Sequence, residues 1–142
     1  MQAISVCGLV KSYGDVEAVR GISFDVPEGS FFAFLGPNGA GKSTTISAIC
    51  SLLSIDSGTI EVFGRSVSDP SVRNEMGIVF QDPLLDKRLT VRETLEIRGS
   101  MYGLADLKDA VERAMEDADC IGFADRRYGT LSGGQRRRAD IA

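Results

Sequence analysis

Short apolar segments separated by turn residues run through the first half of the chain. Residues 31–35 (FFAFL) form a continuous apolar run of strand length, and residues 77–80 (GIVF) form a second. Apolar side chains on both faces of a strand predict burial on both sides, as in a parallel sheet covered by helices. Residues 44–53 are expected to form such a helix, because their apolar positions repeat with the spacing of one helix face. These positions are Ile46, Ile49, Cys50 and Leu53.

Three other segments alternate between apolar and polar residues, which predicts half-buried strands. They are residues 3–10, residues 16–26 and residues 59–63, with a loop expected at residues 11–15. This part of the chain is therefore predicted to be mainly antiparallel strand, wrapped around the start of an α/β core.

After residue 90 the pattern becomes helical. Thr90 and Glu93 have the spacing of a capping box, which predicts a helix running to about residue 103. Residues 107–118 carry the apolar stripe of another helix. Earlier in the chain, Asp69 followed by Pro70 predicts the start of a short helix. No strand signal follows residue 90, so a mostly helical subdomain is expected there.

The chain has 142 residues, which is room for one domain. No apolar run approaches the roughly 20 residues that span a bilayer, and the start lacks a signal peptide, so a cytoplasmic protein is expected. The net charge of −4 argues against general nucleic-acid binding. Three scattered cysteines, with no metal-ligand spacing, predict reduced and mostly buried thiols.

A glycine-rich loop connects the first apolar run to the predicted helix. Its sequence, GPNGAGKS, is the Walker A phosphate-binding pattern in the expected strand–loop–helix context. Glycines allow backbone N–H groups to approach phosphates closely, and the helix start adds unpaired N–H groups. Lys42 is expected to reach the β- and γ-phosphate oxygens, and Ser43 to ligate Mg²⁺. The alternative is a glycine-rich turn that merely precedes a helix. The predicted nucleotide-binding residues are Gly36, Pro37, Asn38, Gly39, Ala40, Gly41, Lys42, Ser43 and Thr44.

A second motif, LSGGQ, occupies residues 131–135. Ser132 is a good N-cap for a helix over residues 135–141, and the glycines leave the first N–H groups open to an anion. An ordinary capped helix start is the alternative. The nearby arginines 126, 127 and 136–138 would suit a nucleic-acid patch, but a solvated or interface-facing basic helix is favoured, since consecutive residues point in different directions.

With both motifs at this separation, the chain closely resembles the nucleotide-binding subunits of ATP-binding cassette (ABC) transporters. The resemblance implies an α/β fold: a P-loop NTPase (RecA-like) core with an antiparallel β subdomain and a helical subdomain. It assigns residues 1–88 to the β and RecA-like core, residues 89–135 to the helical subdomain, and residues 132–142 to the start of the signature helix.

The resemblance also implies roles for two residues outside the motifs. Tyr13 matches the aromatic residue that stacks on adenine, with a half-buried tyrosine as the alternative. Gln81 matches the glutamine that senses Mg²⁺ and the attacking water, with a polar strand terminus as the alternative. Lys42 and Gln81 are therefore the expected catalytic contributors, and Ser43 and Gln81 the expected metal ligands.

In the family, two cassettes close head to tail around ATP and Mg²⁺. The resemblance therefore implies that a second copy contributes its signature residues in trans: Leu131, Ser132, Gly133, Gly134 and Gln135. It also implies a transmembrane permease partner, no nucleic acid, and a place at the inner face of the cell membrane. Residues 82–93 and the arginine-rich helix look most like drug, antibiotic or polysaccharide exporters. A soluble ABC-type ATPase and a non-catalytic truncated remnant are the alternatives.

The family pattern continues past residue 142 into an apolar strand ending in Asp and Glu (Walker B and the catalytic base), and later a switch histidine. The sequence contains no histidine. We therefore expect an incomplete cassette with negligible turnover by itself. The absent strand would pair beside residues 31–35, so an exposed apolar edge is expected there.

Overall fold

A computed structural model of the chain describes residues 1–82 and 85–142. The described chain divides into two compact units, Met1–Ile78 and Val79–Ala142, and each has its own hydrophobic core. Residues 83 and 84, which belong to the exporter-like segment 82–93, lie outside the described residues.

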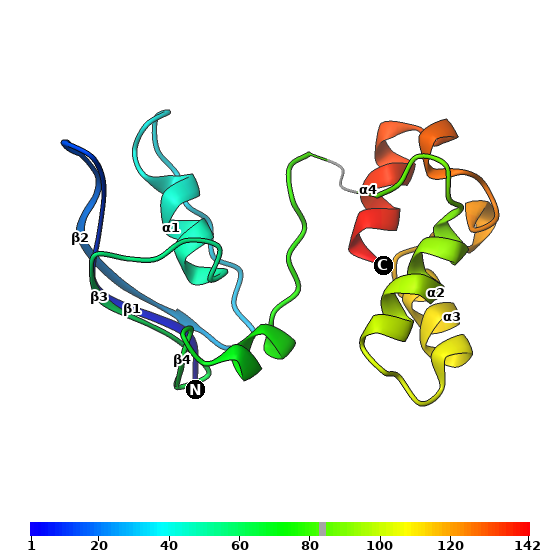
Figure 1. The fold of residues 1–142 in the computed structure, drawn as a ribbon, viewed down its shortest axis with the longest axis horizontal. Helices are drawn as coiled ribbons and strands as arrows, with labels where there is room; N and C mark the ends of the chain where they lie inside the picture. Colours follow the sequence, from blue (N-terminus) through cyan, green and yellow to red (C-terminus); the bar gives the residue numbers. More distant parts are fainter. Residues whose placement is uncertain (83–84) are drawn as a thin grey trace. The chain divides into compact units, whose positions relative to one another are not determined.

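The first unit is built on an antiparallel sheet (Figure 1). Strands β1 (Gln2–Tyr13) and β2 (Val16–Pro27) form a hairpin, and β3 (Ser57–Val62) pairs with the other edge of β1. A short strand, β4 (Arg65–Ser66), completes the order β2-β1-β3-β4. The three strands predicted from alternation are confirmed. β1 extends through Tyr13, where a loop was expected, because a turn at residues 14 and 15 suffices to reverse the chain.

Helix α1 (Lys42–Ile49) packs on this sheet through Ala48 and Ile49. The helix ends at Ile49, with Cys50 as its C-cap, so the expected extent to residue 53 is wrong. The expected apolar stripe is also wrong in part, because Ile46 is 48% exposed. The face that packs against the antiparallel sheet carries Thr45, Ala48 and Ile49, so it includes Ile49 of the expected stripe but not Ile46. The core beneath it consists of Val6, Leu9, Val19, Ala48, Ile49 and Ile60.

The predicted buried strand at residues 31–35 is absent. Phe32 and Phe34 pack against Phe24 of β2, with ring centroids 5.3 and 5.0 Å from it. Phe31 and Leu35 are 95% and 91% exposed, so apolar side chains are exposed here as expected, although they do not lie along the edge of a strand. The segment is not a strand because, among the described residues, no neighbouring strand pairs with its backbone.

Residues 77–80 depart from the prediction in the same way. They have no regular secondary structure, and Ile78, Val79 and Phe80 are each about 40% exposed. Just before them, residues Pro70–Glu75 form a 3₁₀ helix, η1, whose N-cap Asp69 accepts a hydrogen bond from the Ser71 N–H at 2.9 Å. The cap predicted at Asp69 is therefore confirmed.

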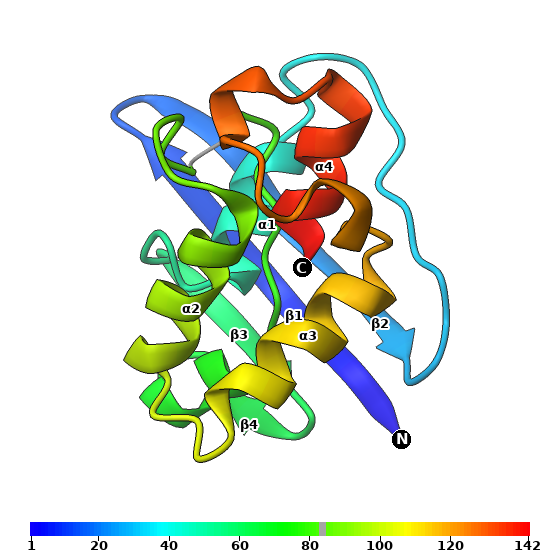
Figure 2. The same ribbon diagram turned by 90° about the vertical axis from the view of Figure 1, so that its right-hand side faces the viewer.

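The second unit is helical, as predicted (Figure 2). Its helices are α2 (Val91–Met101), α3 (Leu107–Asp117) and α4 (Gly133–Ile141), with 3₁₀ helices η2 (Ile121–Phe123) and η3 (Tyr128–Thr130). Helices α2 and α3 lie side by side in both views. The core residues are Leu85, Val91, Leu95, Val111, Met115, Cys120, Phe123, Ala124, Tyr128, Leu131 and Ala139.

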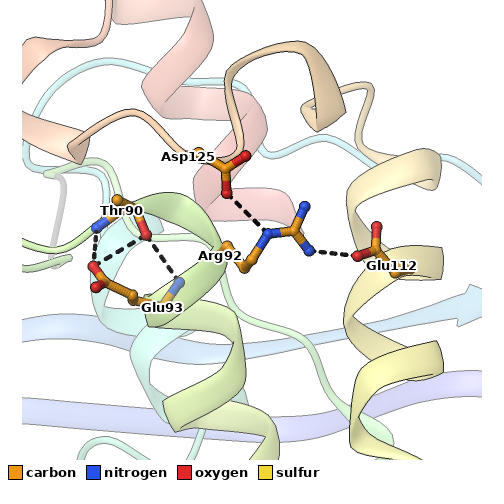
Figure 3. Close-up of polar contacts among 5 residues, drawn as sticks. All are labelled: Thr90, Arg92, Glu93, Glu112 and Asp125. Atoms are coloured by element: carbon orange, nitrogen blue, oxygen red, sulfur yellow. Dashed lines mark hydrogen bonds and ion pairs between the residues drawn. The ribbon is translucent and has the colours of Figure 1, made fainter.

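The start of α2 is fixed by two sets of polar contacts (Figure 3). Thr90 and Glu93 form the predicted capping box, with the Thr90 N–H donating to Glu93 Oε2 at 2.8 Å. Arg92 donates from Nε to Asp125 Oδ1 at 3.0 Å and from Nη1 to Glu112 of α3. These carboxylates raise the pKa of Arg92, Asp125 contributing most. One guanidinium therefore joins α2, α3 and the loop after η2.

The three cysteines differ in exposure. Cys120 is fully buried and Cys50 is half-buried, and burial raises the pKa of each thiol. Cys7 is exposed, so the expectation of mostly buried thiols is wrong for this residue. A break in the regular β1 pairing between Val6 and Leu9 turns both of these residues into the core and leaves Cys7 outside.

Candidate functional site

The glycine-rich loop lies between the apolar segment 31–35 and α1. Gly39 and Gly41 have φ angles of +84° and +81°, in the left-handed region that favours glycine. A Cβ at Gly41 would lie 2.4 Å from the Ala18 carbonyl oxygen of β2. The loop thus approaches β2 so closely that only glycine fits at this position.

Helix α1 begins at Lys42, directly behind this loop. Its N-cap is Gly41, and no side chain in the described chain caps it. By contrast, α2 and α4 each carry a complete capping box. The first N–H groups of α1 therefore remain available to an outside acceptor, and the helix dipole favours a negatively charged one.

Lys42 turns back over the loop. Its Nζ donates to the carbonyl oxygens of Gly36 and Pro37 at 2.7 and 2.6 Å. The ammonium thus lies beside the loop backbone. A phosphate oxygen is able to replace the two carbonyl oxygens as its hydrogen-bond acceptors. Ser43 is exposed, whereas Thr44 is half-buried. Thr45 is 1% exposed and donates to the Gly41 carbonyl at 2.9 Å, which ties the first helical turn to the loop.

Tyr13 lies at the end of β1, paired with Val16 of β2. Its side chain is 54% exposed, and the Lys11 Nζ lies 5.6 Å from the centroid of its ring. Asp56 forms an ion pair with Lys11 at 3.1 Å. Neither Lys11 nor Asp56 was singled out from the sequence. Because residues 11–15 were expected to form a loop, no sequence pattern indicated that Lys11 and Tyr13 share one face of a strand.

The LSGGQ segment belongs to the second unit, and its predicted helix start is confirmed. Ser132 Oγ accepts from the Gln135 N–H at 3.3 Å, and Gln135 Oε1 accepts from the Ser132 N–H at 3.1 Å. Ser132, Gly133 and Gly134 are exposed. Leu131 is only 2% exposed, so its side chain anchors the motif in the core.

A buried tyrosine also holds this helix. Tyr128, 1% exposed, donates its hydroxyl to Asp140 Oδ1 of α4 at 2.7 Å. Burial and this contact raise the pKa of Tyr128 to about 12. No sequence pattern indicated this pairing, because the two residues are 12 positions apart and lie in different elements.

The arginines of α4 are engaged within the second unit. Arg136 donates to the Leu131 carbonyl at 2.9 Å, and Arg137 donates to the Phe80 carbonyl at 2.6 Å. Arg138 forms an ion pair with Asp119. The three side chains point to different partners, as the helical geometry predicted.

Gln81 is exposed and belongs to the second unit. Ser43, its predicted co-ligand for Mg²⁺, belongs to the first. The described residues contain no cluster of three or more His, Cys, Asp or Glu side chains suited to hold a metal ion. Likewise, none of the helices in residues 1–82 and 85–142 is long and apolar enough to cross a bilayer.

Similarity to a solved structure identifies the class of protein to which this fold belongs. The chain superimposes on cbiO1 from Clostridium perfringens, part of the ABC transporter complex cbiONQ, with a TM-score of 0.89 and 27% identity. The match covers 99% of this chain and 59% of that structure. The fold is therefore that of a P-loop ATP-binding domain.

The sequence comparisons identify the family. The family model described as "ABC transporter" matches residues 19–142, so the chain belongs to the ABC transporter family. A daunorubicin/doxorubicin resistance ATP-binding protein of Streptomyces peucetius is 44% identical over 99% of this chain. A Nod factor export ATP-binding protein of a Rhizobium species is 40% identical over 99% of this chain. The chain spans 44% and 47% of the lengths of these two relatives.

Proposed function

We propose that this chain binds ATP and Mg²⁺ as part of the ATP-binding subunit of an ABC transporter that drives export. The observation that carries the proposal is the contact of the Lys42 ammonium with two loop carbonyls, in front of an uncapped helix start. The names of the two relatives support export, since one confers drug resistance and the other exports Nod factor.

The residues of the loop suit a nucleotide triphosphate. Gly39 has no side chain, and a Cβ at this position would have no other heavy atom within 4 Å. The loop surface there is therefore open to an oxygen ligand. Lys42 and the amides of the first helical turn would bind phosphate oxygens, and the exposed Ser43 hydroxyl would be a Mg²⁺ ligand. Bound Mg²⁺ would neutralise phosphate charge. Tyr13 would stack on the adenine, and Gln81 would be a further Mg²⁺ ligand.

Binding is tested with the 142-residue chain and MgATP by calorimetry. Lys42→Ala removes the ammonium, so affinity should fall at least about tenfold, the weight of one charge-assisted contact. Lys108→Ala is the matched control, because Lys108 is exposed on α3 in the other unit. Equal affinity of the wild type and Lys42→Ala contradicts the proposal.

The proposal includes negligible turnover by this chain alone, because the sequence lacks the Asp–Glu strand that the resemblance requires for catalysis. A phosphate-release assay measures this directly. Turnover near an ordinary enzyme rate, about 1 s⁻¹ or faster, that disappears in Lys42→Ala contradicts this part of the proposal.

The signature segment is proposed to contact ATP bound by a second copy, and the assembly to join a permease at the inner face of the membrane. MgATP should then increase the dimer fraction in sedimentation experiments. Gly134→Glu should abolish this increase, since a carboxylate would repel the phosphates. Gly122→Glu is the control, since a Cβ at either Gly122 or Gly134 would have no other heavy atom within 4 Å. ATP-dependent dimerisation that survives Gly134→Glu contradicts the trans contact.

A further inference from the structure

Lys11 lies against the ring of Tyr13. The two residues are two positions apart in β1 and therefore share a face of the sheet. The 5.6 Å from Lys11 Nζ to the ring centroid is within the range of a cation–π contact. The Lys11 side chain is only 13% exposed, whereas Tyr13 is 54% exposed. One face of the ring thus meets a held ammonium, while the ring remains accessible to solvent.

Asp56 holds this ammonium in place. Its Oδ1 pairs with Lys11 Nζ at 3.1 Å, and its Oδ2 accepts the Ser12 N–H at 2.6 Å. Its own N–H donates to the Val10 carbonyl at 3.0 Å. The hydrogen bond from Ser12, followed by that from Lys11, lowers the pKa of Asp56, so this carboxylate is charged at neutral pH. Asp56 is therefore fixed to the backbone of β1, and Lys11 is fixed to Asp56.

We infer that Lys11, held by Asp56, is a positioning residue for Tyr13, and that it leaves the opposite face of the ring for the adenine of ATP. The inference rests on the proposed function, because it takes Tyr13 as the adenine contact. An exposed tyrosine beside a two-residue turn has several rotamers, and ordering it opposes binding. A ring already fixed by Lys11 avoids that cost.

A simple charge effect makes different predictions. If Lys11 only attracted the nucleotide by its charge, removing it would weaken the binding of inorganic tripolyphosphate at least as much as the binding of ATP, since tripolyphosphate carries more charge. Removing the negative Asp56 would then strengthen binding of both anions. If Lys11 instead positions Tyr13, removal of either Lys11 or Asp56 should weaken ATP binding and leave tripolyphosphate binding unchanged. The two explanations therefore differ in the sign of the Asp56 effect.

The experiment measures binding of MgATP and of magnesium tripolyphosphate to the 142-residue chain. The variants are Lys11→Met, Asp56→Asn and Lys11→Arg, with Lys108→Met as the control for loss of one exposed lysine. A base–aromatic stack contributes roughly 5- to 150-fold in affinity, so partial loss of ring order should weaken ATP binding roughly 3- to 10-fold. Lys11→Arg keeps the cation over the ring and should bind ATP like the wild type.

Tripolyphosphate binding also shows that the loop of each variant is folded. Unchanged ATP affinity in Lys11→Met, or parallel loss of ATP and tripolyphosphate in Lys11→Met and Asp56→Asn, overturns the inference alone. Tighter ATP binding by Asp56→Asn overturns it as well. Wild-type chain that binds neither anion, or a Lys42→Ala variant that binds both normally, overturns the proposed function and the inference with it.

Discussion

Replacing Tyr128 with phenylalanine removes one hydroxyl and leaves the buried ring in place. The hydroxyl donates to Asp140 at 2.7 Å, and the side chain is 1% exposed. A hydrogen bond to a charged partner contributes about 1.5–3 kcal/mol. Asp140 is half-buried, so water can rehydrate its carboxylate in the variant, which favours the lower end. We therefore expect Tyr128→Phe to lower the free energy of unfolding by about 1.5 kcal/mol.

The same contact predicts a pH dependence. The pKa of Tyr128 is raised to about 12 in the folded state, against about 10 in an unfolded chain. The stabilisation is therefore fully present below pH 10 and is lost as pH rises toward 12, because the unfolded chain releases the phenolic proton first. The difference in stability between wild type and Tyr128→Phe should shrink over this range.

The assay is urea unfolding followed by circular dichroism, at pH 7 and at intervals between pH 9.5 and 12. Tyr102→Phe is the control, because Tyr102 is 76% exposed. It should unfold like the wild type at every pH. Equal stability of Tyr128→Phe and wild type at pH 7, or a difference between them that does not shrink with rising pH, refutes the reasoning.

Three further predictions concern other parts of the chain. Gly41→Ala should cost about 1–3 kcal/mol of stability and weaken MgATP binding, since its φ is +81° and its Cβ would meet the Ala18 carbonyl. Calorimetry measures both effects, with Gly122→Ala as the control, since a Cβ at Gly122 would have no other heavy atom within 4 Å. Arg92→Met should cost about 1 kcal/mol by urea unfolding, and the cost should fall with added salt; an undiminished cost in 1 M salt contradicts an ionic contribution. Phe31→Lys should leave unfolding unchanged and reduce self-association in sedimentation, because Phe31 is 95% exposed; equal association of both proteins contradicts it.

Local patterns in the sequence determined much of this chain. Alternating residues predicted the three long antiparallel strands, and the Thr90–Glu93 and Ser132–Gln135 spacings predicted two helix starts that the structure confirms. The glycine-rich loop and the helix behind it were also predictable. These features depend on hydrogen bonds and packing within a few residues, so the local sequence is sufficient to specify them.

Contacts between distant segments were decided only by the tertiary structure. Residues 31–35 have the composition of a buried strand, yet they remain unpaired because a strand requires a partner that its own sequence does not supply. The contacts of Lys11 with Asp56 and of Tyr128 with Asp140 join residues 45 and 12 positions apart. No local pattern encodes such pairings, because they depend on how the packed elements bring the side chains together.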